Sequence, residues 1–137
     1  MALLALLASA ACLATPVHGG KVMAGPFTGV VIPQYDVVQG RFRLHVGSYR
    51  NRATGMSQKI GWVVPTSYRV GNWLTVTGRR LSPSRQTFAQ KFEEAYSPDF
   101  HDGWVFPSDI TPPSAGCWKL TLSSGNARGT LTVLVRG

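Results

Sequence analysis

The sequence has few charged residues and few cysteines. Charged side chains make up 15% of its 137 residues, against a usual share of about 25%, and cysteine occurs twice. Hydrophobic residues account for 44%, enough to bury an apolar core, so the composition argues against an intrinsically disordered chain. A chain of this length is expected to form one domain.

Long hydrophobic runs and internal repeats are also missing. Residues 2–11 form a short apolar run, whereas a membrane-spanning helix needs about 20 residues, and no second run follows. With Gly 15 and Pro 9, turn-forming residues are too frequent for a helical bundle. They are typical of an all-β domain with many turns.

The apolar run is typical of the core of an export signal, although a buried N-terminal helix is an alternative. Residues 9–11 before Cys12 resemble a bacterial lipobox, which would make Cys12 a lipidated N-terminus. The lipobox lacks the usual Leu, and no Lys or Arg precedes Lys21. Residues 8–10 read Ala-Ser-Ala, which suits an ordinary signal peptidase. We expect a leader over 1–14 and an exported protein, either lipid-anchored in the cell envelope or extracellular.

Residues 15–25 contain Thr15, Pro16 and three Gly and predict a linker, which leaves the folded domain at 26–137. Cys12 then belongs to the leader and Cys117 to the domain. If Cys12 is removed or lipidated, Cys117 has no partner within the chain, whereas the two can pair if the leader is retained. In the first case we expect Cys117 to be a buried, inert thiol.

Segments of β-rich or alternating composition predict about seven short strands, which indicates a two-sheet antiparallel sandwich. They are residues 27–32, 39–46, 59–64, 73–77, 104–106, 117–122 and 128–135. Residues 123–127 predict a hairpin loop, since they contain Gly and Asn. Residues 85–96 contain neither Gly nor Pro, and Phe88 and Phe92 fit one helical stripe. We therefore predict an excursion from the sandwich over 85–103, beginning as a short helix or an irregular connection.

The most specific pattern lies in residues 112–120, where Gly116 and Cys117 precede Trp118. It resembles the closing hairpin of bacterial immunoglobulin-like and polycystic-kidney-disease-like modules. In them a Gly permits a tight corner and the aromatic ring packs beneath it. Together with residues 55–65 and 74–79, the Gly-Cys-Trp motif is similar to a group of small bacterial envelope proteins, many with a lipoprotein leader. The resemblance implies an immunoglobulin-like sandwich in the cell envelope and carries no catalytic residues.

Motifs of common enzymes and cofactor sites are missing. The sequence has no Gly-x-Ser-x-Gly elbow and no phosphate-binding glycine loop. Asp99, His101 and Asp102 match neither a calcium loop nor a zinc motif, and predict a polar loop tip. We expect no cofactor, no metal and no enzymatic activity.

The basic residues give the chain a formal net charge of +8. Arginine side chains can hold phosphate or carboxylate groups through two parallel hydrogen bonds. An exported protein meets anionic envelope polymers, glycans and lipids, and export argues against nucleic acid as a partner. A simple solubilising role is the alternative. The candidate binding residues are Arg41, Arg43, Arg79, Arg80, Trp73 and Trp104. The two tryptophans could stack on sugars.

These observations predict a secreted or lipid-anchored bacterial envelope protein that acts as a non-enzymatic binding or interaction module. Its partner would be an anionic envelope polymer, a glycan or a protein, with the membrane as a further partner through a lipid on Cys12. One alternative narrows this to a glycan- or anionic-polymer-binding module. The other is an envelope hydrolase or metal-dependent enzyme, which would need a buried site around His45 or His101.

Overall fold

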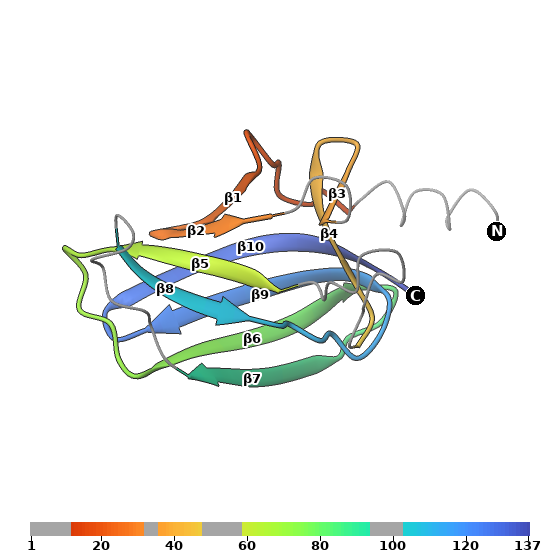
Figure 1. The fold of residues 1–137 in the computed structure, drawn as a ribbon. Helices are drawn as coiled ribbons and strands as arrows, with labels where there is room; N and C mark the ends of the chain where they lie inside the picture. Colours follow the sequence, from red (N-terminus) through yellow and green to blue (C-terminus); the bar gives the residue numbers. More distant parts are fainter. Residues whose placement is uncertain (1–11, 32–35, 48–58, 94–102) are drawn as a thin grey trace, which may run out of the picture.

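The computed structural model describes residues 12–31, 36–47, 59–93 and 103–137, which form two sheets (Figure 1). The four-stranded sheet has the order β1 (Lys21–Ala24), β2 (Phe27–Val30), β5 (Ile60–Pro65) and β8 (Gly103–Ser108). The six-stranded sheet has the order β3 (Val37–Val38), β4 (Arg41–His45), β10 (Ala127–Arg136), β9 (Gly116–Ser124), β6 (Trp73–Ser82) and β7 (Thr87–Glu93). Among these residues no helix is long and apolar enough to cross a membrane.

All seven predicted strands are present, as β2, β4, β5, β6, β8, β9 and β10, so the all-β sandwich is confirmed. Strands β1, β3 and β7 are additional. The six-stranded sheet is mixed rather than purely antiparallel, because β10 pairs with β4 in parallel. The hairpin between β9 and β10 is tighter than predicted, since Ser124 pairs with Ala127 across Gly125 and Asn126.

The predicted short helix or irregular connection within 85–96 is wrong for Thr87–Glu93, which form the edge strand β7, paired with β6. A spacing of four between Phe88 and Phe92 fits a helical stripe, but it also fits a strand, where every second residue shares a face. Their half-buried positions alternate with exposed ones throughout β7. Residues 94–102, the rest of the predicted excursion before β8, lie outside the described residues.

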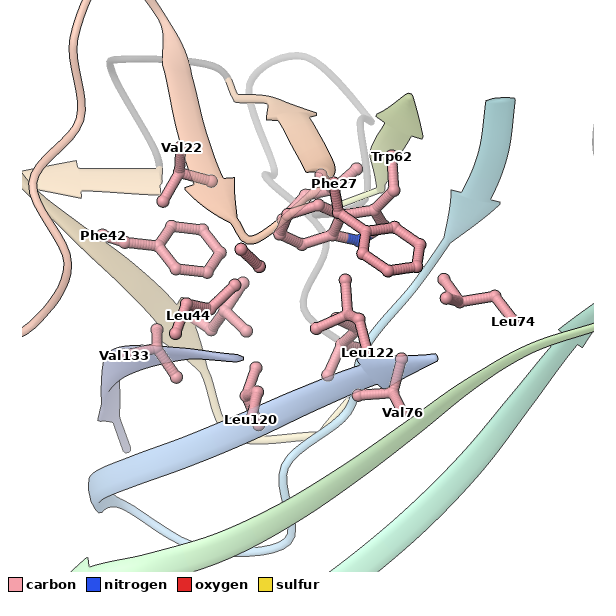
Figure 2. Close-up of a cluster of buried hydrophobic side chains, with 14 of the residues drawn as sticks. Val22, Phe27, Phe42, Leu44, Trp62, Leu74, Val76, Leu120, Leu122 and Val133 are labelled. Atoms are coloured by element: carbon pink, nitrogen blue, oxygen red, sulfur yellow. The ribbon is translucent and has the colours of Figure 1, made fainter. Parts of the chain in front are cut away.

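The core lies between the two sheets and draws large side chains from both (Figure 2). Trp62 of β5 and Trp118 of β9 are fully buried, and for Trp118 this is the packing that the resemblance implied. Phe42 meets the Trp62 indole edge to face, with ring centroids 6.4 Å apart. Trp62 Nε1 donates to Ser108 Oγ at 2.9 Å, which satisfies the one polar atom of this buried ring.

The segment that precedes β1 is part of the sandwich, which differs from the predicted linker over 15–25. Thr15 N donates to Thr132 O of β10 at 2.8 Å, and Phe42 N of β4 donates to Thr15 O at 2.9 Å. Thr15 thus lies between β4 and β10, and the chain then crosses to the four-stranded sheet, where β1 pairs with β2. Flexible composition did not prevent order, because these backbone groups all find partners.

Cys12 and Cys117 form a disulfide, with their Cα atoms 5.5 Å apart. This is the pairing that the sequence allowed if Cys12 stays in the chain. Cys117 belongs to β9 and is 4% exposed. Gly116 before it has a φ of 142°, and a Cβ there would collide with Ser82 O. The corner before Trp118 therefore requires glycine, as predicted.

Candidate binding face

The outer face of the six-stranded sheet carries hydroxyl and basic side chains. Burial alternates along β6, β7, β9 and β10, so every second residue points away from the core. The strand registers align twelve of these residues in three rows, which we call the basic face. The first row is Lys91, Thr75, Ser123 and Arg128; the second is Ala89, Thr77, Thr121 and Thr130; the third is Thr87, Arg79, Lys119 and Thr132. The outward residues Trp73 and Glu93 form a further row next to the first, and Glu93 brings a carboxylate to this side of the sheet.

Two cations stand side by side in the third row. Arg79 of β6 is in register with Lys119 of β9, and both are exposed. Side chains directly opposite each other on one face have Cβ atoms about 5 Å apart, and like charges at this spacing repel. One anionic group between them would accept hydrogen bonds from both and offset the repulsion. The pair therefore favours a bound anion.

An open hollow of about 510 Å³ lies over this pair. Its lining comes from three neighbouring strands and consists of Thr77, Gly78, Arg79, Thr87, Phe88, Ala89, Lys119 and Thr121. The threonine hydroxyls can donate hydrogen bonds to the oxygens of an anion whose charge the two cations balance. A ligand here stays partly in solvent, which suits one segment of an extended molecule better than a small molecule that must be enclosed.

On the core side of the sheet, behind the hollow, β7 is held by aromatic packing. Gly78 has no side chain, and the ring of Phe88 occupies the space where a Cβ would lie. The same ring meets Trp118 edge to face, with centroids 5.2 Å apart. Such pairs contribute about 0.5–1.5 kcal/mol beyond the burial of their area. This contact holds edge strand β7 against β6, and with it the position of Thr87 beside Arg79.

Arg80 differs from its neighbour Arg79 in its surroundings. Successive side chains of a strand point to opposite faces, and the Arg80 guanidinium is used within the protein. It donates to Ser84 O at 2.7 Å, Ser84 Oγ at 2.6 Å, Ser114 Oγ at 2.8 Å and Ala115 O at 3.1 Å. The two arginines, both candidate binding residues, therefore lie in separate environments, and of the two only Arg79 lines the hollow.

Arg41 and Arg43 lie on β4, which is separated from β9 by β10. Arg41 Nη1 donates to Ala14 O at 2.7 Å and so holds the segment before β1. Arg43 is half-buried and in register with Leu134. Neither side chain lines the hollow, so the structure does not bring these two arginines together with Arg79.

The two candidate aromatics belong to different sheets. Trp73 of β6 is 45% exposed and points to the same side as Arg79, at the end of the basic face. It is in register with Glu93, and Lys91 lies diagonally next to it. Trp104 of β8 is half-buried and packs against the core. Trp73 alone of the two therefore has the exposure that stacking on a sugar requires.

Of the two histidines named for a possible enzymatic site, His45 lies among the described residues. It ends β4 in register with Arg136, and its pKa is lowered from 6.5 by partial burial and by the charges of Arg43 and Arg136. Within the described ranges, no three His, Cys, Asp or Glu side chains gather as a metal site would need. The predicted polar loop tip, with Asp99, His101 and Asp102, falls outside those ranges.

The structure adds Lys119, Lys91 and Arg128 to the candidate binding residues. Part of the signal was in the sequence, because Trp118, Leu120 and Leu122 share a predicted face and leave Lys119 on the other. What sequence periodicity could not supply is the register between β6 and β9, strands that are far apart along the chain. That register alone places Lys119 opposite Arg79.

The β-sandwich is observed, while the closer resemblance to immunoglobulin-like and polycystic-kidney-disease-like modules stays a prediction. No known family model matches the chain, and no curated protein is similar to it in sequence.

Proposed function

We propose that the protein is a non-enzymatic binding module of the bacterial cell envelope, secreted or lipid-anchored, whose basic face binds an anionic polymer. The observation that carries the proposal is the placement of Arg79 opposite Lys119 in an open hollow lined by threonine. Two like charges in register are unfavourable in the free protein. An anionic ligand bound between them relieves this repulsion, which favours binding.

The extent of the basic face supports a polymer as the ligand. Lys91 and Arg128 end the first row, about 14 Å apart across three strand spacings. The pair in the third row lies a further 14 Å or so along the strands. Hydroxyl side chains occupy most positions between these cations. A chain with repeated anionic groups can contact several cations at once, while a single small anion can contact one group of them.

Trp73 favours a glycan as the polymer. Its exposed ring lies six residues before Arg79 on the same side of β6, which is about 20 Å at 3.4 Å per residue. A sugar ring can stack on an indole while anionic groups elsewhere on the same chain reach the cations. An acidic glycan can therefore use Trp73 together with the basic face, whereas a polyanion without sugar rings uses only the cations and hydroxyls.

The proposal is tested by binding to two probes, heparin and inorganic polyphosphate, which share anionic groups but differ in sugar rings. We expect both to bind the oxidised protein, with affinity that falls as salt rises. The double variant Arg79→Ala/Lys119→Ala should bind each probe about tenfold more weakly or worse, because two charge-assisted contacts are lost. Trp73→Ala should weaken heparin binding and leave polyphosphate binding nearly unchanged.

The matched control is Lys21→Ala/Lys59→Ala, which removes two exposed positive charges next to the four-stranded sheet. Both double variants have the same net charge, so a difference between them reports the location of the charge. Equal losses in the two variants would show that only the overall positive charge attracts the probes, and the proposed site would then be abandoned.

A further inference from the structure

The disulfide of Cys12 bears on where the leader is cleaved. The two cleavage patterns in the sequence treat this residue differently: the lipobox makes it a lipidated N-terminus, and the Ala-Ser-Ala pattern leaves it inside the mature chain. In the structure its sulfur is bonded to Cys117. One sulfur atom cannot carry both a thioether-linked lipid and a disulfide, so the two fates exclude each other.

The residues after Cys12 are hydrogen-bonded to the neighbouring strands and the loops next to them. Ala14 is 3% exposed, and its carbonyl oxygen accepts from Arg41 Nη1. Thr15 is bonded through its backbone to both β4 and β10, and its Oγ1 accepts from Thr132 N at 2.9 Å. Val17 N donates to Gly40 O at 2.8 Å. A cut after residue 14 would remove Cys12 and Ala14 and leave Arg41 and Cys117 without these partners.

We infer that the leader is cleaved on the N-terminal side of Cys12, between Ala10 and Ala11, and that Cys12 enters the mature exported protein as a disulfide with Cys117. Ala8 and Ala10 supply the two small residues that a signal peptidase requires before the bond it hydrolyses. Hydrolysis adds one water and leaves a carboxylate on Ala10 and a free amine on Ala11.

The disulfide forms by exchange with an external disulfide donor, such as an oxidised thiol–disulfide oxidoreductase of the exporting compartment. One cysteine thiolate attacks the donor disulfide and forms a mixed disulfide, and the second cysteine then displaces the donor. The two cysteine thiols lose two electrons and two protons, and the donor is released as its dithiol. The inference rests on the export in the proposed function and selects its secreted form over the form anchored through Cys12; its test involves no ligand.

The experiment expresses residues 1–137 in a bacterium with an oxidising periplasm and measures the intact mass of the exported protein. We expect a chain that begins at Ala11 and weighs two hydrogens less than its reduced form. Iodoacetamide should add nothing before reduction and two carbamidomethyl groups after it. A lipid adduct on Cys12, an N-terminus beyond Cys12, an uncleaved chain or free thiols before reduction would each overturn the inference.

Three substitutions separate the cleavage routes even if folding is impaired. Cys12→Ser should leave the cleavage site unchanged, because an ordinary signal peptidase does not need the thiol, whereas the lipoprotein route would stop. Ala10→Tyr should block cleavage, while Ser9→Tyr at the unrestricted middle position should not. Blocked processing of Cys12→Ser, or equal processing of the two tyrosine variants, would refute cleavage after Ala10.

Discussion

Arg79 and Lys119 occupy directly opposite positions on neighbouring strands of the six-stranded sheet, with both side chains on its outer face. They are separated by forty positions in the sequence, and only the pairing of β6 with β9 brings their charges together. The pair has consequences for stability as well as for binding, and the two can be measured independently.

Removing one member of the pair should stabilise the ligand-free protein. We expect Lys119→Thr to raise the free energy of unfolding by about 0.2–1 kcal/mol at low salt, because a like-charge pair becomes a neutral contact. At 1 M salt, where the screening length is about 3 Å, the gain should nearly vanish. Thermal denaturation at both salt concentrations measures this, with Lys59→Thr as a control for net charge. A Tm at low salt no higher than that of the control would contradict it.

Reduction of the disulfide should destabilise the domain. Cys12 and Cys117 are separated by 105 residues in sequence. A disulfide typically stabilises by about 2–4 kcal/mol, and more when the loop it closes is long. Urea denaturation of the oxidised protein and of Cys12→Ser measures the difference. Adding a reductant should lower the stability of the oxidised protein to that of the variant. Equal stability with and without reductant would show that the pairing contributes nothing.

Substitution by alanine should destabilise the protein strongly at Trp104 and only slightly at Trp73. Trp104→Ala removes a ring packed against the core and is expected to cost about 3 kcal/mol. Trp73→Ala truncates a ring that is 45% exposed and should change stability by less than about 1 kcal/mol. Chemical denaturation followed by circular dichroism compares them. A larger loss for Trp73 than for Trp104 would mean that Trp73 serves the fold rather than a ligand.

His45 should make the protein less stable in mild acid. Burial, Arg43 and Arg136 lower its pKa in the folded state, so the unfolded chain binds a proton more readily. The free energy of unfolding should therefore decrease as pH falls below about 6.5, until the folded-state pKa is passed. Urea denaturation between pH 7.5 and 5 compares the protein with His45→Gln, whose stability should change less over this range. Parallel pH profiles would rule out this histidine as the cause.

The sequence was sufficient to predict strands whose polar and apolar residues alternate. Phe42 and Leu44 of β4 and Leu120 and Leu122 of β9 identify their buried faces without ambiguity. Strand β7 was missed because Phe88 and Phe92 satisfy both the helical and the strand periodicity. The Gly and Pro content of segment 15–25 predicts a linker, because composition carries no information about the partners of Thr15 in β4 and β10.

The candidate site could be predicted only in part. Alternation separates Arg79 from Arg80 and Trp73 from Leu74, so the outward side of β6 could be inferred from the sequence. Which strand lies next to β6, and in what register, depends on contacts between distant segments. Composition gives the number of arginines but not which of them a ligand can reach. Arg80, for example, donates hydrogen bonds to Ser114 and Ala115 of its own chain.

The placement of Thr15 against Thr132 also constrains the order in which the domain folds. These residues are 117 positions apart, so the first residues of the domain cannot form these contacts before the last strand is present. Until β10 has been synthesised, β4 and the segment before β1 lack their shared neighbour, and contacts of such separation slow folding. The sandwich can therefore be completed only after the whole chain has been made, because β10, which lies inside the larger sheet, is the last strand in the sequence.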